Sequence, residues 1–349
     1  MTTIARVAQE AGVGVGTVSR VINGSTAVSE ETRRRVLEVV EELGYAPNAT
    51  ARALSTGRTR AVGVIAPFFT RPSVIERLRG VGPLLASSAY QLILVDVESP
   101  RQREAAFHSL IGRVDGLLSI TLAPGPADLE RLAAAGVPVV LIDHAHERLP
   151  SVSVDDVAGG RLAVSHLLEL GHERIAFAGD TVDEVHGSSA SSRRCTGYRA
   201  ALADAGLPAS DELIALRPHG NEARDLVDEL LALPEPPSAV FAASDQQALA
   251  VIDAVRRRGL RVPEDVSVVG FDDVELARYA GLTTVAQPLE LSGARAAELL
   301  LASLDGSEIS TARQHLPLEL VVRDTTAPAD GSKIAAGAKE ARRRAVRMT

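Results

Sequence analysis

The N-terminal stretch from residue 4 to residue 23, IARVAQEAGVGVGTVSRVIN, predicts two short helices joined by a tight turn. The apolar positions of the first helix recur at i, i+3, i+4 and i+7, the spacing of one helix face: Ile4, Val7, Ala8 and Ala11. Gly12 suits the left-handed conformation that ends a helix. The second helix, over 15–22, turns three apolar residues inward: Val18, Val21 and Ile22. This pattern predicts a helix-turn-helix.

The outward face of the second helix carries side chains suited to DNA contact: Val15, Gly16, Ser19, Arg20 and Asn23. A recognition helix lays such a face in the major groove, where Arg20 can donate two hydrogen bonds to guanine and Val15 can contact a thymine methyl group. A third helix is expected over 30–43, capped by Ser29 and ended by Gly44, with its apolar residues inward: Val36, Leu37, Val40 and Leu43. Spacing alone leaves open a three-helix packing module with no role in DNA binding.

The glycines at 12, 14 and 16 also resemble the phosphate-binding loop of dinucleotide-dependent enzymes. That loop follows a strand and requires a further glycine at its last position. Here the preceding segment reads as a helix and the last required position is Thr17, so the context disfavours a dinucleotide site.

From residue 61 the chain alternates short apolar runs with amphipathic stretches of helical length. The runs are rich in Val, Ile and Leu, as expected of parallel strands covered by helices on both faces: 61–68, 90–97, 114–120, 138–144, 174–180, 238–244 and 266–273. This alternation predicts a doubly wound α/β fold with parallel sheets. Such sheets place ligands at the C-terminal ends of their strands, where we expect a pocket.

The composition excludes several classes of protein. No window approaches 18 consecutive apolar residues and the N-terminus lacks a secretory pattern, so we expect no membrane span and a cytoplasmic location. The single cysteine, Cys195, cannot form an internal disulfide or a cysteine zinc site. The eight histidines are scattered, and no G-x-S-x-G motif or lysine-containing phosphate loop occurs. We therefore expect no metal, no cofactor and no enzymatic activity.

The net charge of −8 is unevenly distributed. Residues 1–60 carry eight basic and six acidic side chains, whereas 61–326 carry 23 and 37. A mildly basic head thus precedes an acidic body, an asymmetry compatible with nucleic-acid binding by the head. The tail at 327–349 is basic and lacks strand periodicity, so it is predicted to be disordered or a frayed helix.

Several longer motifs occur in the head and in the body of the chain. The head carries AGV at 11–13, TVSRVIN at 17–23, VSEETR at 28–33 and ELGYAPN at 42–48. The body carries GGRLAVSHLLELGHERIAF at 159–177 and SDQQALAVIDAVRRRGLRVPEDVSVVGFDD at 244–273. These motifs resemble those of the LacI/GalR family of bacterial transcriptional repressors. The resemblance covers about 1–326 and stops at the tail.

We expect four parts in the chain, the last of which is the basic tail at 327–349. A DNA-binding head at 1–46 is followed by a hinge helix and linker at 47–60, and by a two-lobed, periplasmic-binding-protein-like core at 61–326. Lobe one is expected at about 61–152 and 285–309, and lobe two at about 153–284 and 310–326. The resemblance also implies a homodimer that reads a palindromic double-stranded operator with a central CG step.

The resemblance places the DNA contacts in the head and hinge. In the family, the segment corresponding to 48–55 folds on specific DNA and its leucine, here Leu54, wedges into the minor groove. From composition alone this segment would be a flexible linker, since eight residues are too few for a helix stable by itself. The DNA-binding residues expected are Thr3, Ile4, Val15, Gly16, Thr17, Ser19, Arg20, Asn23, Ser29, Thr32, Tyr45, Asn48, Ala51, Leu54 and Ser55.

The resemblance also implies a small-molecule effector between the lobes, with a sugar or related polyol favoured over a purine. The effector-binding residues expected are Phe68, Phe69, Arg71, Asp143, Arg194, Asp245, Asp272 and Gln287. Carboxylates accept hydroxyl hydrogen bonds and a guanidinium donates several, which suits a polyol. For Asp245 a helix cap, and for the two phenylalanines ordinary lobe packing, stay open as alternatives. Ser244 stands where the family commonly has Asn.

These features together predict an effector-controlled transcriptional repressor that acts through linkage between effector and DNA binding. A binding protein of a transport system would use the same core, but the intact head and the lack of a signal peptide argue against it. An enzyme of the Rossmann type is disfavoured because the glycines at 12, 14 and 16 follow a predicted helix and the last required glycine is absent.

Overall fold

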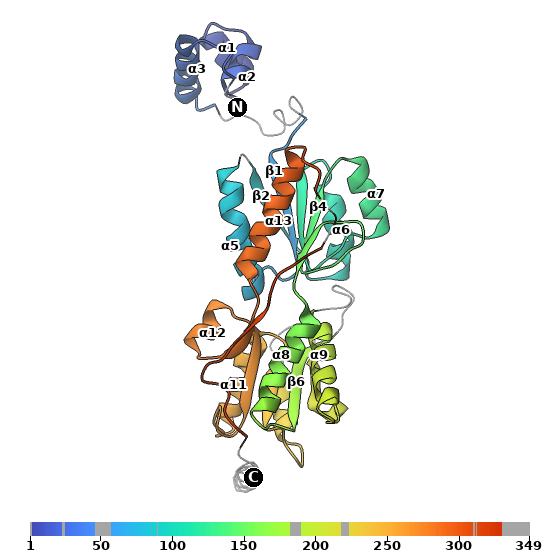
Figure 1. Cartoon of the computed structure of the whole chain (residues 1–349). Helices are drawn as coiled ribbons and strands as arrows, with labels where there is room; N and C mark the ends of the chain where they lie inside the picture. Colours follow the sequence, from blue (N-terminus) through green and yellow to red (C-terminus); the bar gives the residue numbers. More distant parts are fainter. Residues whose placement is uncertain are drawn as a thin grey trace. The chain divides into compact units, whose positions relative to one another are not determined.

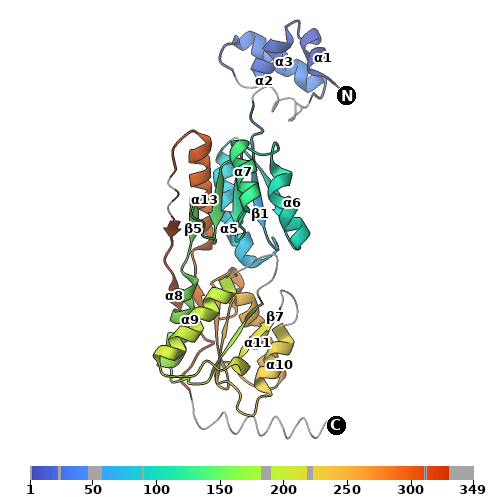
Figure 2. The same ribbon diagram turned by 90° about the vertical axis from the view of Figure 1, so that its right-hand side faces the viewer.

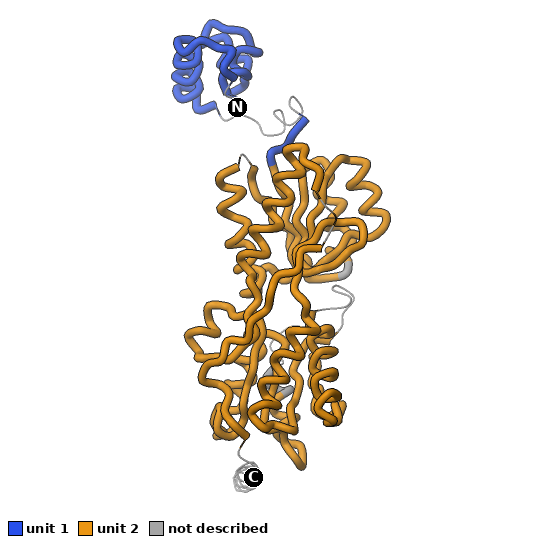
Figure 3. The backbone as a smooth tube through the Cα atoms, in the orientation of Figure 1, with its two compact units in different colours: residues 1–60 blue, residues 61–349 orange. Residues whose placement is uncertain are grey.

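The computed structural model describes residues 2–22, 25–45, 57–88, 90–181, 190–217, 223–309, 311 and 313–329. Backbone contacts divide the chain into two compact units, residues 1–60 and residues 61–349 (Figure 3). The predicted hinge at 48–55 and most of the predicted tail lie outside the described residues.

The first unit contains three helices, α1 (Ile4–Glu10), α2 (Val15–Ile22) and α3 (Glu30–Glu42). They pack around a small core that includes Val7, Val18 and Val36, each fully buried. The Thr3 side chain caps α1 and the Ser29 side chain caps α3. The predicted helix-turn-helix is confirmed. The expectation that Leu37 is buried is wrong, because Val36 already fills the core side of α3 and Leu37 is 47% exposed.

The second unit begins with a six-stranded sheet, here called the sheet of lobe one. Its strand order is β11-β5-β4-β3-β1-β2, with all neighbours parallel. The strands are β1 (Ala61–Ala66), β2 (Gln91–Asp96), β3 (Gly116–Ile120), β4 (Val139–Ile142), β5 (Ser151–Ser153) and β11 (Arg313–His315). Helices α5 (Pro72–Ser87) and α13 (Leu289–Leu304) cover one face, and α6 (Pro100–Leu110) and α7 (Pro126–Ala134) cover the other (Figure 2).

A second six-stranded sheet forms lobe two, with strand order β12-β10-β9-β8-β6-β7. The strands are β6 (Ile175–Asp180), β7 (Ile214–Arg217), β8 (Ala239–Ala242), β9 (Ser267–Asp272), β10 (Thr283–Ala286) and β12 (Glu319–Val321). Within the described ranges only β12 runs antiparallel to its neighbour. One face is covered by α8 (Asp156–Glu169) and α9 (Ala190–Asp204), the other by α10 (Ala223–Leu231), α11 (Asp245–Arg257) and α12 (Glu275–Tyr279). A short 3-10 helix at Asp211–Leu213 precedes β7.

The chain passes between the two sheets three times: after β5, after β10 and between β11 and β12 (Figure 1). The sheets differ slightly from the lobe bounds expected from the sequence. Strand β10 ends at Ala286 and belongs to lobe two, whereas 285–309 was expected in lobe one. Strand β11, at 313–315, pairs with β5 in lobe one, whereas 310–326 was expected in lobe two. Both differences arise from backbone pairing, because β10 pairs with β9 in lobe two and β11 pairs with β5 in lobe one.

The α/β fold class predicted from the apolar runs is confirmed, and each of the seven runs contains a strand. The start of the predicted tail is ordered, contrary to expectation. The Ala327 carbonyl accepts a hydrogen bond from the buried His172, and Ala329 N–H donates to Leu170 O. These bonds hold 327–329 against lobe two. No helix in the described part of the chain is long and apolar enough to cross a membrane.

Candidate functional site

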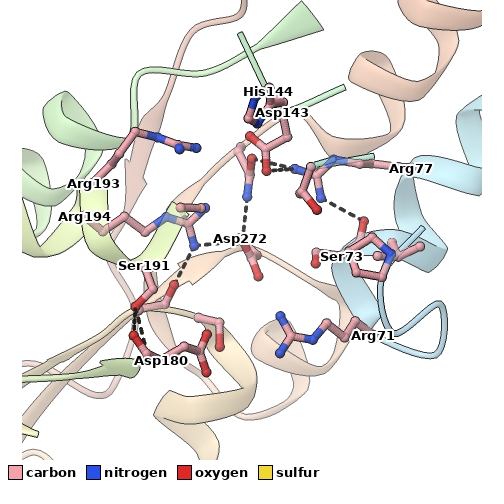
Figure 4. A pocket seen from close by; sticks show the side chains of 17 residues that line it. Arg71, Ser73, Arg77, Asp143, His144, Asp180, Ser191, Arg193, Arg194 and Asp272 are labelled. Carbon is pink, nitrogen blue, oxygen red and sulfur yellow. Dashed lines mark hydrogen bonds and ion pairs between the residues drawn. The ribbon is translucent and has the colours of Figure 1, made fainter. Parts of the chain in front are cut away.

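A cleft lies between the two lobes of the second unit, at the C-terminal ends of strands from both sheets (Figure 4). Residues that end or directly follow seven different strands line it: Pro67, Thr121, Asp143, Asp180, Ala243, Asp272 and Gln287. Side chains from α5 and α9 complete the walls. This is where parallel sheets were expected to place a ligand.

The backbone turns sharply where the strands enter the cleft. Thr121, Asp143 and Asp272 have φ angles of 57°, 61° and 124°, in the region that favours glycine. Backbone strain of this kind costs about 1–3 kcal/mol per residue and clusters at functional sites. The packed sheets below hold these residues in place, because the strands they end are fully buried.

On the lobe-one wall, Arg77 from α5 binds Asp143 from the end of β4. The distance from Arg77 Nη2 to Asp143 Oδ2 is 3.0 Å, and the same nitrogen donates to Gln287 Oε1 at 3.2 Å. Gln287 lies on the segment that crosses between the lobes, and its Nε2 donates to Asp272 Oδ1 in lobe two at 2.6 Å. A continuous chain of polar contacts therefore links the two walls.

On the lobe-two wall, Arg194 from α9 is held on three sides. Its Nε donates to Asp156 Oδ1 at 2.9 Å, its Nη1 donates to Ala243 O at 2.5 Å, and Nη1 lies 3.7 Å from Asp272 Oδ1. The guanidinium carbon lies 3.6 Å from the centre of the Phe271 ring. These contacts fix the orientation of the Arg194 guanidinium. Burial of a charge is unfavourable unless the charge is paired, and here the carboxylates and the aromatic ring supply the partners.

Burial and the neighbouring charges act in opposite directions on the pKa values of the carboxyl groups in the cleft. Burial raises the pKa of Asp143, and the adjacent Arg77 counters the rise. Burial likewise raises the pKa of Asp272, countered by Arg194. Burial opposes the charge of Arg194, but the carboxylates around it, Asp156 first, raise its pKa overall. Burial, followed by repulsion from Arg193, lowers the pKa of His144, which favours its neutral form.

In each of the two central carboxylates, Asp143 and Asp272, protein groups bind only one of the two oxygen atoms among the residues that the structure describes. Asp143 is bound through Oδ2 and Asp272 through Oδ1. Asp143 Oδ1 and Asp272 Oδ2 have no hydrogen-bond partner among the residues that the structure describes, and neither is enclosed as a buried unpartnered atom. The cleft thus offers two acceptor oxygens, one from each lobe, with fixed positions.

Five of the eight residues expected to bind the effector line this cleft: Arg71, Asp143, Arg194, Asp272 and Gln287. Phe68 and Phe69 do not, because the chain turns at Phe68 (φ 49°) and Phe69 N–H donates to Asp96 Oδ1 outside the cleft. The Phe68 ring instead lies 5.1 Å from the guanidinium carbon of Arg71.

Asp245 also lies outside the cleft lining, contrary to its expected role in effector binding. It is fully buried below the β9–α12 loop, where Oδ2 accepts from Val274 N–H and Oδ1 accepts from the Thr284 hydroxyl. Burial raises its pKa to about 8. The cap of α11 is Ser244, not Asp245. Asp245 therefore anchors the loop that carries Asp272.

Sequence reasoning missed several residues of the cleft, above all Arg77. Val74, Arg77 and Val81 share the buried face of α5, so a charged residue on an apolar helix stripe was the available signal. Arg193 was also missed, although it adjoins Arg194 and binds the same carboxylate, with Nη2 2.7 Å from Asp156 Oδ2. Ser73 and Asp180 line the cleft from the start of α5 and the end of β6.

The head presents the expected face of α2 outward. Val15 is 46% exposed, Gly16 and Arg20 are exposed, and Thr17 and Ser19 are half-buried. Thr3 is exposed at the cap of α1, and Ile4 and Tyr45 pack partly against the head core. Ser29 and Thr32 are bonded to each other through their hydroxyl oxygens at 3.0 Å. The remaining predicted DNA contacts lie outside the described residues: Asn23, Asn48, Ala51, Leu54 and Ser55.

The described residues contain no group of three or more His, Cys, Asp or Glu side chains arranged to hold a metal ion. The charged groups of the cleft are instead arranged as guanidinium–carboxylate pairs.

Known families match both units of the chain. Residues 3–48 match bacterial regulatory proteins of the lacI family, and residues 164–326 match a periplasmic binding protein-like domain. The HTH-type transcriptional regulator DegA of Bacillus subtilis is 36% identical over 344 residues, which cover 94% of this chain and 98% of that protein. The chain belongs to the LacI family.

Solved structures of family members have the same fold. A transcriptional regulator CelR–cellobiose complex is 36% identical, with a TM-score of 0.68 over 93% of this chain and 100% of that chain. The lac repressor dimer bound to operator and the anti-inducer ONPF is 29% identical, with a TM-score of 0.78 over 93% of this chain and 99% of that chain. The relatives are transcriptional regulators and not enzymes, so this LacI-family member is a DNA-binding transcriptional regulator.

Proposed function

We propose that this protein is a repressor whose affinity for a palindromic operator is controlled by a sugar bound in the cleft between the lobes. The observation that carries the sugar proposal is the pair of fixed acceptor oxygens, Asp143 Oδ1 and Asp272 Oδ2. Sugar hydroxyl groups donate to such carboxylate oxygens and accept from a guanidinium such as that of Arg194. The CelR–cellobiose complex supports the same ligand class, since it is a sugar complex of a related chain.

For DNA binding we propose that α2 enters the major groove with Val15, Gly16 and Arg20 toward the bases. Ser19, Thr17 and Thr3 would then contact the phosphate backbone or adjacent bases. The exposure of this face supports the proposal, because a face that contacts DNA must be open in the free protein. Leu54 is proposed as the minor-groove wedge on the basis of the sequence resemblance alone.

Control by the effector is proposed to work through a homodimer acting in the cytoplasm, and at the nucleoid when bound to an operator. Two copies of α2 are needed to read the two halves of a palindrome. A sugar that binds both Asp143 and Asp272 changes the relative free energy of lobe arrangements, because it joins both walls. Linkage then requires that operator DNA alters sugar affinity by the same factor by which sugar alters operator affinity.

Fluorescence anisotropy of a labelled palindromic duplex with a central CG step tests the proposal. A sugar from a panel that also contains purine bases and nucleosides should change operator affinity of the wild-type protein and not of Asp272→Asn. If a purine alone alters operator affinity, the sugar assignment is wrong. If the protein binds the palindrome no better than a scrambled duplex at matched salt, sequence-specific repression is wrong.

A further inference from the structure

We propose that the effector carries an anionic group, a carboxylate or a phosphate, and that this group binds on the lobe-one wall at the N-terminus of α5. The inference rests on the proposed function, since it assigns a chemical class to the ligand of the same cleft. In this arrangement the hydroxyl groups of the effector face Asp272 and Arg194, and its oxyanion faces Arg71 and Arg77 (Figure 4).

Arg77 is the first element of the anion site. It lines the cleft but is only 3% exposed. Its Nη1 donates to Ser73 O, and its Nη2 donates to Asp143 and Gln287. Its Nε is buried and has no acceptor in the described part of the chain. A buried N–H without a partner is unfavourable, and guanidinium groups are well suited to bind carboxylate and phosphate oxygens.

The backbone fixes Arg77 at this position. A Cβ added to Gly293 of α13 would lie 2.0 Å from Arg77 O, and one added to Gly80 of α5 would lie 1.9 Å from Glu290 O. Helices α5 and α13 therefore touch backbone to backbone, which only glycine permits. Arg77 is held at the cleft by helix packing and not only by its ion pair with Asp143.

The first turn of α5 is the second element. The helix has 16 residues and begins at Pro72, and its N-cap residue, Arg71, makes no side-chain capping hydrogen bond. The Ser73 N–H has no hydrogen-bond partner among the described residues. Ser73 and Val74 both line the cleft, so the positive end of the helix dipole faces the ligand space.

A hydroxyl group extends the same wall. Thr121 follows β3 and lines the cleft, and its Oγ1 is a buried atom without a partner in the described ranges. A hydroxyl donates to an oxyanion as readily as it accepts from a neutral ligand. Thr121 Oγ1 and Arg77 Nε are thus two buried polar atoms of the lobe-one wall that lack a hydrogen-bond partner among the described residues.

The lobe-one wall of the cleft is more positively charged than the lobe-two wall, as an anion site on lobe one requires. The lobe-one lining contains Arg71 and Arg77 against a single carboxylate, Asp143. The lobe-two lining contains two arginines and two aspartates, and Asp156 adds a further carboxylate behind them. His144 adds no charge when neutral, the form that burial favours by lowering its pKa. An anionic group is therefore favoured on lobe one and disfavoured on lobe two.

Isothermal titration calorimetry of the full chain with matched ligands tests this assignment. The sets are glucose, glucuronate and glucose 6-phosphate, and galactose, galacturonate and galactose 6-phosphate. We expect an acid or phosphate to bind at least about tenfold more tightly than its neutral parent. Arg71→Gln and Arg77→Gln should each remove most of that preference. Arg79→Gln, on the same helix but outside this cleft lining, is the matched control and should keep it.

The outcomes separate this inference from the proposed function. Neutral sugars that bind as tightly as the charged ones and change operator affinity would overturn the anion site and leave the sugar-controlled repressor standing. An anion preference that survives both Arg71→Gln and Arg77→Gln would overturn the location. If no acid or phosphate binds more tightly than its neutral parent, the anion site is wrong, whereas the sugar-controlled repressor is wrong only if no sugar of the wider panel changes operator affinity. If Arg77→Gln does not fold, Arg71→Gln still tests the location of the anion site. Arg71 is a half-buried helix-cap residue, so its replacement should leave the fold intact.

Discussion

The carboxylate of Asp156 holds the guanidinium of Arg194 from behind, with Asp156 Oδ1 2.9 Å from Arg194 Nε. The Asp156 side chain is fully buried, and its other oxygen binds Arg193. One carboxylate thus orients both arginines of the lobe-two wall. The neighbouring residue, Asp155, has a different role. Its side chain caps α8 by accepting hydrogen bonds from Val157 N–H and Ala158 N–H.

Asp156→Ala should therefore abolish the effector response and destabilise the fold by about 3–5 kcal/mol, because it leaves Arg194 buried with a weakened charge partner. Asp155→Ala is the matched control, expected to cost about 0.5–2 kcal/mol for the lost cap and to keep effector binding. Urea unfolding gives the stabilities and calorimetry gives the effector affinities. Equal loss of effector binding in the two variants would contradict the orienting role.

Arg20→Ala should weaken operator binding by about 1–3 kcal/mol and relax base preference at one symmetric position in each half-site. The reason is that Arg20 lies on the exposed face of α2 and can bind guanine through two donors. Arg34→Ala, an exposed arginine of α3 paired with Glu38, is the control and should leave base preference unchanged. Anisotropy on a set of operator variants measures both. Uniform weakening on all sequences would make Arg20 a phosphate contact.

A chain ended after Ala329 should remain folded and dimeric, with at most a modest loss of salt-dependent DNA affinity from the removed basic residues. A chain ended after Val322 should be destabilised, because it lacks Thr325, whose hydroxyl donates to Val268 O and accepts from Thr283 N–H. It also lacks Ala327, the partner of His172. Light scattering and thermal unfolding measure these effects. A wild-type tetramer that becomes a dimer after the first truncation would contradict the prediction.

The stability of the second unit should fall as pH rises toward 8 because of Asp245. Burial raises the pKa of this carboxyl group to about 8, and no cation pairs with it among the described residues. Between about pH 4 and pH 8 the folded chain keeps the proton while the unfolded chain has lost it. The unfolded state then binds fewer protons, so the free energy of unfolding falls with rising pH, by up to about 1.4 kcal/mol per unit.

Urea unfolding of the wild-type protein and Asp245→Asn between pH 5 and pH 7.5 measures this contribution. The asparagine side chain stays neutral, so the variant should show a flatter decline than the wild type over that range. Parallel pH profiles for the two proteins would mean that Asp245 is ionised in the fold, held by its bonds from Thr284 and Val274.

The sequence was most informative where a residue's role depends on its local pattern. The apolar spacing around Val7 and Val18 predicts the head, and the runs at 138–144 and 266–273 predict two of the strands. The family resemblance singles out Asp143 and Asp272 at the ends of those strands, and both line the cleft. Short strands such as β7 and β11 carry no such apolar pattern, so the sequence does not predict them. Pairing with strands elsewhere in the chain stabilises them instead.

Where the cleft lining differs from the residues expected from the sequence, the difference depends on three-dimensional context. Phe68 leaves the cleft because of a single backbone turn with positive φ, which no side-chain pattern signals. Asp245 and Asp272 both lie close to strand ends, yet only Asp272 reaches the cleft. Arg77 comes to the cleft through a glycine contact between helices more than 200 residues apart in the chain.

The three crossings between the sheets have a consequence for synthesis on the ribosome. Strand β5 is complete at Ser153, but α13, which covers one face of the same sheet, begins only at Leu289. At about 5–20 residues per second, the intervening chain takes roughly 7 to 27 seconds to emerge. During that interval apolar side chains such as Val140 and Ile142 lack the helix that later covers them. This face of the lobe-one sheet therefore stays partly uncovered in the nascent chain until α13 has been made.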